Sequence, residues 1–331
     1  MKKIVLIFLS TFLSVILIEF LLRFYGITPW QYVETDNPVI YESDPNLGWK
    51  AKKGSYLIDV KGFPKRKIKM TFGEQGNRIS DNPNLNDESP TIVFIGGSFT
   101  QGWGVNDQDT FPSKIQDEYK EFYVYNLAQS GYGGVQSLLT LEEKIEKINK
   151  PKLIIYGFIE HHEYRNVARS SWLATLLKYS RRGYSDNPKL PYVIIDKNGD
   201  LKKKPPINYL RLPLREKSAI IALFEKVYMK QISRKRKQFQ KPATKKVILE
   251  MHQISKRNKS KFLVAILDWS NDLSNEEYKN FFIQKEINYV DCKIPLDVST
   301  LIPGDYHPNG KGHSLYKDCI SNFINKNNLL F

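Results

Sequence analysis

The stretch that decides the fold is TIVFIGGSFTQGWGV, residues 91–105. Its first part, IVFI, is a short apolar run bounded by turn residues, which is typical of a strand buried on both faces. Gly96 and Gly97 end the run, and Ser98 follows them directly. A hydroxyl at the tip of a buried strand is either a helix cap or turn residue, or a group placed there for chemistry. The rest of the chain has to distinguish these two interpretations.

The sequence beyond residue 105 alternates between helix and strand patterns. Such alternation predicts right-handed crossovers and a mostly parallel α/β sheet. Thr110 is expected to cap the first helix. Helices are predicted at residues 110–120, 133–148, 244–257, 275–285 and about 310–325, and strands at 122–127, 152–159, 261–268 and 287–291.

Two segments do not follow this alternation. Residues 26–90 are polar and rich in turn residues, and they predict short strands and loops that wrap around the core. Residues 163–240 contain a predicted hairpin around Asn198-Gly199 and an amphipathic helix, and they predict an insertion or cap. The expected organisation is an anchor at 1–25, the wrapping segment at 26–90, and the main α/β domain at 91–331 with its insertion at about 163–240.

The N-terminus predicts a membrane anchor. Lys2 and Lys3 precede an uncharged run, residues 4–18, which Glu19 interrupts and residues 20–22 resume. The whole run is just long enough to span a bilayer, which takes roughly 17–25 residues. A cleaved signal peptide and a buried helix are the alternatives. A cleavage site needs small residues, whereas the first alanine of the chain is Ala51.

Orientation and charge narrow the possible partners. Lys2, Lys3 and the N-terminal amine outweigh Arg23, so the N-terminus is expected in the cytoplasm and the bulk of the chain outside it. The net charge of +15 favours anionic partners. Nucleic acid is not expected outside the cytoplasm, which leaves lipid headgroups and acidic polysaccharide. The basic run SRKRK at 233–237, with Lys202–Lys204, is either a solvated face or a contact with such anions.

The chain has two cysteines, Cys292 and Cys319. In an oxidising compartment they can form a disulfide, which the chain-entropy model values at roughly 3–4 kcal/mol. The alternative is a pair of unbonded core cysteines. The sequence leaves both open.

Polar residues gather where the predicted strands end, the edge at which α/β sheets bind ligands. Ser98 follows the first strand, Gly131 the second, and His161, His162 and Asn166 the third. Asp305 and His307 precede the last helix. The spacing of these histidines is not typical of a metal site.

These residue types fit nucleophilic catalysis. A serine needs a base, and the base needs an orienting partner. Asp305 and His307 are two residues apart and project to the same side in an extended turn, so the carboxylate can orient the imidazole toward Ser98. The backbone N–H groups of Ser98 and Gly131 are candidate donors to an oxyanion. A side-chain donor from the third cluster would complete the hole.

At this point the sequence resembles the SGNH, or GDSL-type, hydrolases. FIGGSFTQG is similar to their serine block, NLAQSGYG to their glycine block and GDYHPNGKGH to their histidine block. The segment from ESDPNLGW to GNRIS is similar to the N-terminal part of membrane-anchored members. The resemblance implies a three-layer, flavodoxin-like sandwich, with Ser98 as nucleophile, His307 as base, Asp305 as its partner and Gly131 as oxyanion donor.

The sequence departs from the family pattern at three places. Gly97 replaces the aspartate of Gly-Asp-Ser. The last block is Asp-x-His instead of Asp-x-x-His, a variant that also occurs in SGNH-like enzymes that acetylate alginate. The third block normally reads Gly-x-Asn-Asp, but GFIEHHEYRN has no asparagine in place. His161, His162 or Asn166 is therefore expected to supply the side-chain oxyanion donor.

The rival serine-hydrolase fold fits less well. The α/β-hydrolase elbow reads G-x-S-x-G, and Thr100 stands where its last glycine belongs. The acid and base of that fold are also well separated in sequence, unlike Asp305 and His307.

The expected function is an anchored, extracytoplasmic serine esterase or O-acyltransferase. Its substrate would be an acyl ester, most simply an acetyl ester, of a cell-surface or secreted polysaccharide, or another acyl ester. No metal or organic cofactor is expected. The alternative is a glycan-binding or polysaccharide-assembly protein that keeps the scaffold without catalysis. Oligomeric state, and hydrolysis versus transfer, stay open.

Overall fold

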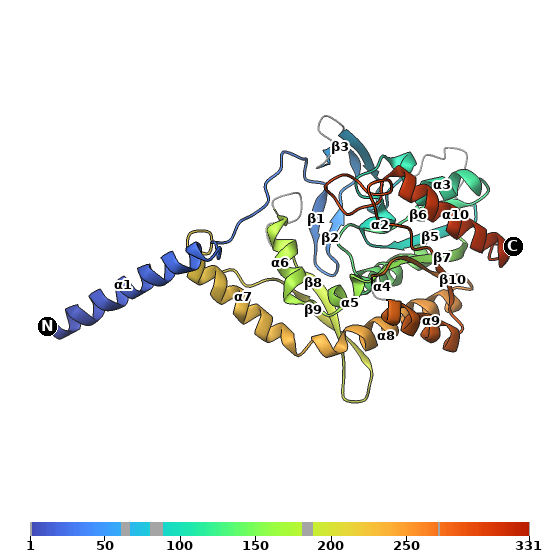
Figure 1. Ribbon diagram of the computed structural model, residues 1–331. Helices are drawn as coiled ribbons and strands as arrows, with labels where there is room; N and C mark the ends of the chain where they lie inside the picture. The colour runs from blue at the N-terminus through green and yellow to red at the C-terminus, as the bar shows by residue number, and fades with distance from the viewer. Residues whose placement is uncertain (1, 61–66, 80–88, 181–187, 271, 331) are drawn as a thin grey trace.

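The computed structural model describes residues 2–60, 67–79, 89–180, 188–270 and 272–330 (Figure 1). Its centre is a parallel sheet of five strands in the order β11-β10-β7-β5-β6. The strands are β5 (Thr91–Gly96), β6 (Tyr123–Asn126), β7 (Pro151–Ile159), β10 (Lys261–Asp268) and β11 (Asn288–Asp291). Numbered along the chain, this order is 2-1-3-4-5, the flavodoxin-like arrangement. The predicted parallel α/β fold is confirmed.

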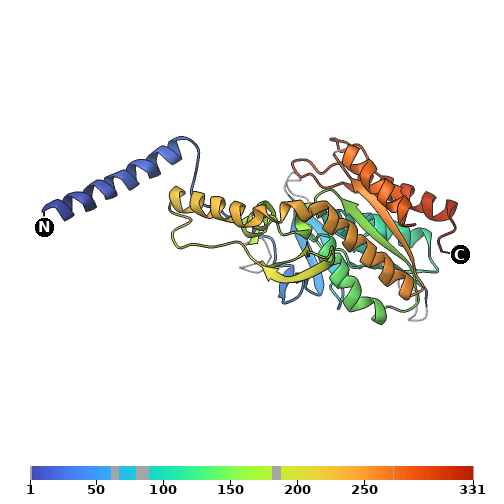
Figure 2. The same cartoon turned by 90° about the horizontal axis from the view of Figure 1, so that it is seen from below.

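Side-chain alternation along the strands builds the two layers that cover the sheet. Val93 and Ile95 of β5 pack with one apolar cluster, whereas Ile92 and Phe94 pack with the other. The first cluster includes α4 (Gly134–Lys144), α8 (Gln240–Arg257) and α9 (Asp272–Gln284), and the second includes α3 (Phe111–Glu118) and α10 (Gly310–Lys326). Figure 2 shows the helices on either side of the sheet.

The predicted helix starts are mostly correct. Thr110 caps α3 by accepting the N–H of Ser113 at 3.2 Å, as expected. Asn309 caps α10 by accepting two backbone N–H groups. Helices α8 and α9 begin a few residues before the predicted positions, because helical periodicity marks a buried face better than a helix end. Short 3-10 turns lie at Asp107–Asp109, Ile145–Lys147 and Lys237–Phe239.

The wrapping segment forms two antiparallel hairpins, β1 (Tyr41–Asp44) with β2 (Gly48–Ala51) and β3 (Gly54–Asp59) with β4 (Lys67–Phe72). Parts of the segment, 61–66 and 80–88, lie outside the described residues. Trp49 and Met70 from these hairpins are buried in a third apolar cluster. Leu173 and Leu190 from the predicted insertion belong to the same cluster, so the two segments pack together.

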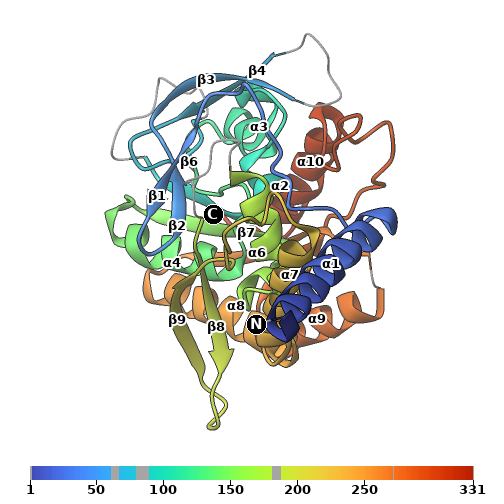
Figure 3. The ribbon, with the colours of Figure 1, turned by 90° about the vertical axis from the view of Figure 1, so that its left-hand side faces the viewer.

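The region that breaks the alternation contains α5 (His162–Asn166), α6 (Ser170–Lys178), β8 (Leu190–Ile195), β9 (Leu201–Ile207) and α7 (Ala219–Arg234). Strands β8 and β9 form the hairpin predicted around Asn198-Gly199. Figure 3 shows this hairpin projecting from the body. The exact domain limits stay a prediction.

Helix α1 (Lys2–Phe24) extends away from the rest of the molecule (Figures 1 and 2). None of its residues is buried, and its most apolar window has a mean hydropathy of 2.7. It is long and apolar enough to cross a membrane, as a signal sequence also would be. At the other end of the chain, Cys292 and Cys319 form a disulfide that ties the segment after β11 to α10.

Candidate active site

The nucleophile candidate, Ser98, is the first residue of the short helix α2 (Ser98–Gln101), directly after β5. Its side chain is almost buried, and its Oγ lies 2.8 Å from Nε2 of His307. Its N–H has no partner within the helix because the first residues of a helix lack an acceptor four residues earlier. The hydroxyl and the backbone donor predicted for Ser98 therefore lie at the same point of the sheet edge.

Asp305 and His307 complete a hydrogen-bonded relay. Oδ1 of Asp305 lies 2.5 Å from Nδ1 of His307 and also accepts the backbone N–H of His307 at 3.1 Å. Burial raises the pKa of Asp305, but hydrogen bonds from His307 and Trp103 outweigh it, so the pKa lies below its usual range. The carboxylate therefore stays charged and holds the imidazole with its other nitrogen toward Ser98. The spacing of two residues allows this hydrogen bond because Asp305 and His307 belong to one tight turn.

Two aromatic rings lie beside the imidazole of His307. The ring of Phe99 lies 5.6 Å and that of Trp103 6.4 Å from the imidazole of His307. Both residues belong to the stretch 91–105 that opens the domain. Neither was singled out from the sequence, although Phe99 lies in the serine block and Trp103 directly follows it.

The glycine block lies next to the nucleophile. Gly131 has φ of 83°, a left-handed conformation that glycine adopts without strain. The backbone of this loop is bound to the strand before Ser98, since Gln129 donates to the carbonyl of Gly96. Ser130 and Gln129 also contact the side chain of Gln101 in α2. Loop and nucleophile thus form one rigid unit.

The third block places its three candidate donors differently. His161 is exposed just beyond β7, and the charges of Arg165 and His307 contribute to lowering its pKa. His162 is buried, and its Nδ1 lies 2.6 Å from the hydroxyl of Tyr156. Asn166 is also buried. His161 is the one of the three at the rim of the site.

Asn166 is used inside the structure. Its Oδ1 accepts the N–H of Val135 in α4, and its Nδ2 donates to Oγ1 of Thr244 in α8, both at 2.9 Å. The amide therefore joins two helices of one layer and does not extend toward Ser98. We drop it as an oxyanion donor on this ground.

Loss of solvent around the rings lowers the pKa of both neighbouring histidines, although His161 keeps an exposed edge and His162 is fully buried. Desolvation, followed by the charge of Arg165, lowers the pKa of His161 to about 4. The same causes lower the pKa of His162 well below its usual range. At neutral pH each ring carries one N–H, which can act as a hydrogen-bond donor without adding charge to the site.

The two departures at Gly97 and in the third block are coupled by geometry. A Cβ on Gly97 would lie 3.0 Å from Nε2 of His162, 3.2 Å from the carbonyl oxygen of Tyr132 and 3.3 Å from Nη1 of Arg165. The side chains of the third block therefore occupy the space that a residue larger than glycine would need. Nε2 of His162 is buried there without a hydrogen-bond partner.

Arg78 is a supporting residue that the sequence reasoning missed. Its guanidinium donates to the carbonyls of Gln101, Gly102 and Val105, and it is paired with Asp107 at 3.0 Å. It thus holds the carboxyl end of α2 and the turn after it. The segment GNRIS, which contains Arg78, drew attention only through its resemblance to anchored family members.

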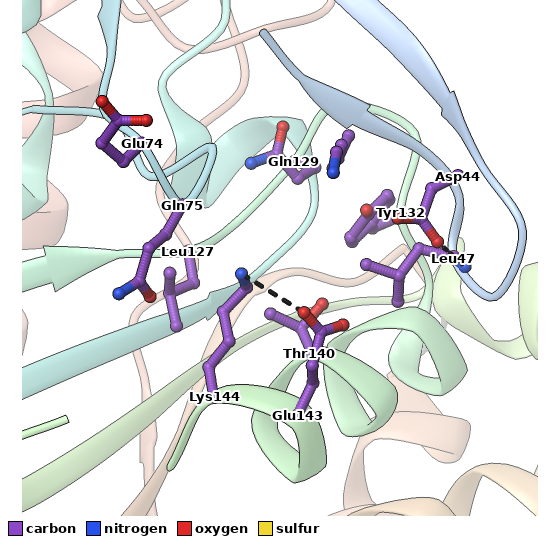
Figure 4. Close-up of a pocket in the computed structure, with 11 residues that line it drawn as sticks. Asp44, Leu47, Glu74, Gln75, Leu127, Gln129, Tyr132, Thr140, Glu143 and Lys144 are labelled. Carbon is purple, nitrogen blue, oxygen red and sulfur yellow. Dashed lines mark hydrogen bonds and ion pairs between the residues drawn. The ribbon is translucent and has the colours of Figure 1, made fainter. Parts of the chain in front are cut away.

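A small cavity lies behind the glycine block. It has a volume of about 50 Å³ and is lined by Asp44, Gln75, Gln129, Tyr132 and Lys144, among others (Figure 4). Ser98 and His307 do not line it. Residues of the wrapping segment and of α4 line it together, so it lies apart from the relay of Ser98 and His307. Among the described residues, no group of three His, Cys, Asp or Glu side chains could hold a metal ion.

Comparisons with known proteins give structural neighbours only. Neither a protein-family model nor a curated sequence matches the chain. An esterase from Pseudoalteromonas sp., solved with monoethylphosphonate as inhibitor, is 12% identical, with a TM-score of 0.40 over 71% of this chain and 97% of its own. A member of the lipolytic G-D-S-L family from Veillonella parvula is 10% identical, with a TM-score of 0.40 over 71% and 97%. A carbohydrate esterase described as having divergent catalytic and non-catalytic binding functions is 15% identical, with a TM-score of 0.39 over 74% and 69%.

Proposed function

We propose that this protein is a membrane-anchored serine esterase or O-acyltransferase that works outside the cytoplasm. The observation that carries the proposal is the relay from Asp305 through His307 to Ser98, with distances of 2.5 Å and 2.8 Å. This order of groups is what an activated serine requires.

The mechanism follows from the positions of these groups. His307 takes the proton of Ser98 as Oγ attacks the acyl carbonyl, and Asp305 stabilises the imidazolium. The tetrahedral oxyanion is held by the N–H groups of Ser98 and Gly131 and by His161 as side-chain donor. The intermediate collapses to an acyl-enzyme, and the alcohol leaves with the proton from His307. Water or a sugar hydroxyl then resolves the acyl-enzyme by the same steps in reverse.

The proposed substrate is an O-acyl, most simply O-acetyl, polysaccharide of the cell surface. Three features support it: the N-terminal helix, the disulfide between Cys292 and Cys319, and the net charge of +15. The first two fit a position outside the cytoplasm, where disulfides persist and nucleic acid is not expected. The charge fits an anionic glycan.

The test measures release of acetate from O-acetylated polysaccharide, with and without a deacetylated acceptor. Wild type should release or transfer acetyl groups, and Ser98→Ala should do neither while keeping its unfolding temperature. A suitable control is Lys120→Ala, because Lys120 is exposed and lies away from the relay. Asn166→Ser is not suitable, because the amide of Asn166 joins α4 and α8. Acetyl release by Ser98→Ala equal to wild type would contradict the proposal.

A non-catalytic glycan-binding role is the second candidate. The observation that favours it is the absence of the usual asparagine in the third block. The intact relay argues against it, because a binding protein has no need for a base within 2.8 Å of a serine. Glycan binding by wild type without any acyl turnover would support it.

A further inference from the structure

Helix α7 carries an exposed apolar stripe. Phe224 and Val227 are each 58% exposed, Tyr228 46% and Ile232 43%. Their spacing of three, one and four residues places them on one face of the helix. The opposite face is buried and consists of Ala219, Ala222, Glu225, Met229 and Ser233. The outward face of this helix, and not only its buried face, is therefore rich in large apolar side chains.

The N-terminus of α7 is built onto the C-terminal part of α1. The carboxylate of Glu19 accepts the N–H groups of Ala219 at 2.8 Å and Ile220 at 3.1 Å and the hydroxyl of Ser218 at 2.9 Å. Arg23 donates to the carbonyl of Lys217 at 2.6 Å. A carboxylate at the N-terminus of a helix stabilises it through the free N–H groups and the helix dipole. Helices α1 and α7 thus meet end to end (Figures 1 and 2).

Basic side chains follow the apolar stripe along one edge. Lys226, Lys230 and Arg234 are exposed at intervals of four residues, and Lys235 and Lys237 continue beyond the helix. The acidic residue of this helix, Glu225, is buried and paired with Arg215 at 2.9 Å. An exposed apolar face with basic residues beside it is typical of helices that lie in the interface of an anionic membrane.

Aromatic side chains surround the junction. Arg215 lies 3.9 Å over the ring of Trp30, whose ring is 5.4 Å from that of Tyr209 and 6.3 Å from that of Tyr32. Tyr209 is buried, and the backbone N–H of Trp30 donates to the carbonyl of Arg215 at 2.9 Å. The cluster therefore binds the segment that follows α1 to the segment that precedes α7.

We propose that α7 lies in the interface of the anchoring membrane, with Phe224, Val227, Tyr228 and Ile232 among the lipid chains and the basic residues at anionic headgroups. The occupant of the stripe is the lipid surface because Glu19 of α1 binds the first residues of α7 and so holds the stripe beside the proposed anchor. The proposal rests on anchoring by α1 and not on the esterase chemistry.

The test uses the full chain in nanodiscs that contain phosphatidylglycerol and brominated phosphatidylcholine. Cys292 and Cys319 are bonded to each other, so single cysteines can be introduced and labelled with an environment-sensitive fluorophore. The probe is Phe224→Cys on the apolar stripe. The matched control is Lys226→Cys, two residues away and exposed on a different face, and the anchor control is Leu13→Cys in α1.

The proposal predicts several-fold stronger quenching by brominated lipid at position 224 than at 226, with position 13 also quenched. Replacing phosphatidylglycerol with phosphatidylcholine, or changing Glu19→Gln, should reduce quenching at 224 and leave position 13 unchanged. Equal, solvent-like signals at 224 and 226 with position 13 quenched would overturn the proposal, as would protection of 224 by a second copy in detergent. An unquenched position 13 would overturn the anchoring on which it rests. Labelling of Ser98 by a fluorophosphonate in the same samples reports on the esterase proposal separately.

Discussion

The turns after β5 and β7 leave neighbouring strands at the same edge of the sheet, yet they direct their polar side chains oppositely. After β5, Ser98 is aimed at His307, which arrives from a part of the chain 209 residues away. After β7, His162 and Asn166 point into the core and bond to Tyr156, Val135 and Thr244. The first turn carries the proposed nucleophile, and side chains of the second turn lie against Gly97 of the first. Position at a strand end alone therefore does not make a polar residue catalytic.

The largest expected effect comes from breaking the relay. In Asp305→Asn the imidazole of His307 would be held in the wrong tautomer, so kcat should fall by about 10⁴-fold, the loss seen when a relay aspartate becomes asparagine. Steady-state hydrolysis of an activated acetyl ester measures the effect. The change should leave the unfolding temperature nearly unaltered. A loss of less than ten-fold would mean that Asp305 does not orient the base.

The next largest effect concerns His161, at the start of the turn after β7. His161→Ala removes the proposed side-chain donor, and kcat should fall by about 10²–10³-fold, as for loss of one oxyanion donor. His161→Asn, which places an amide N–H donor at this position, should retain most of the rate. If kcat is unchanged and only KM rises, His161 binds substrate and does not stabilise the transition state.

A smaller effect tests whether the second turn supports the first. Gly97→Ala places a methyl group 3.0 Å from Nε2 of His162, so we expect a loss of about 1–3 kcal/mol in the free energy of unfolding from overpacking. His162→Ala opens space at that point, so the double variant should be more stable than the sum of the two single effects predicts. Urea unfolding of the four proteins gives the coupling energy. Additive effects would show that the two turns do not touch in the way described.

The smallest effect is a pH dependence of stability. The pKa of His162 is lowered in the folded protein, so its stabilising contribution is complete above the unfolded pKa near 6.5 and is lost as the pH falls below it. Between pH 6.5 and 5.5 this loss amounts to about 1 kcal/mol. His162→Gln cannot take up a proton and should remove this part of the acid sensitivity, whereas His161 and His313, whose pKa values are also lowered, keep their own parts. An unchanged profile would place another group behind the acid sensitivity.

The sequence predicted the parts that depend on local pattern. The strands alternate with helices of clear periodicity, and Ser98, Asp305 and His307 stand in short motifs whose chemistry needs those residue types. What it could not provide is the direction of side chains in the third block, since His161 and His162 are adjacent but one is exposed and the other buried. Burial there is set by α4, α8 and Tyr156, which are distant in sequence.

Other features were hidden for the same reason. Arg78 belongs to a polar segment without periodicity, and its role appears only when its guanidinium is seen among the carbonyls after Ser98. The pairing of Cys292 with Cys319 depends on the packing of α10 against β11, so spacing alone left it open. Glu19 interrupts an apolar run in the sequence, and the structure shows that its carboxylate caps α7.

The most direct measurement of the central claim is peptide-resolved mass spectrometry after reaction of the full-length protein with a fluorophosphonate. Only an activated serine forms the adduct rapidly, because the base must remove the hydroxyl proton during attack. We predict one adduct on wild type, located on Ser98 and absent in Ser98→Ala, with strongly slowed labelling in His307→Ala. No adduct on well-folded wild type, or an adduct on another serine, would contradict it.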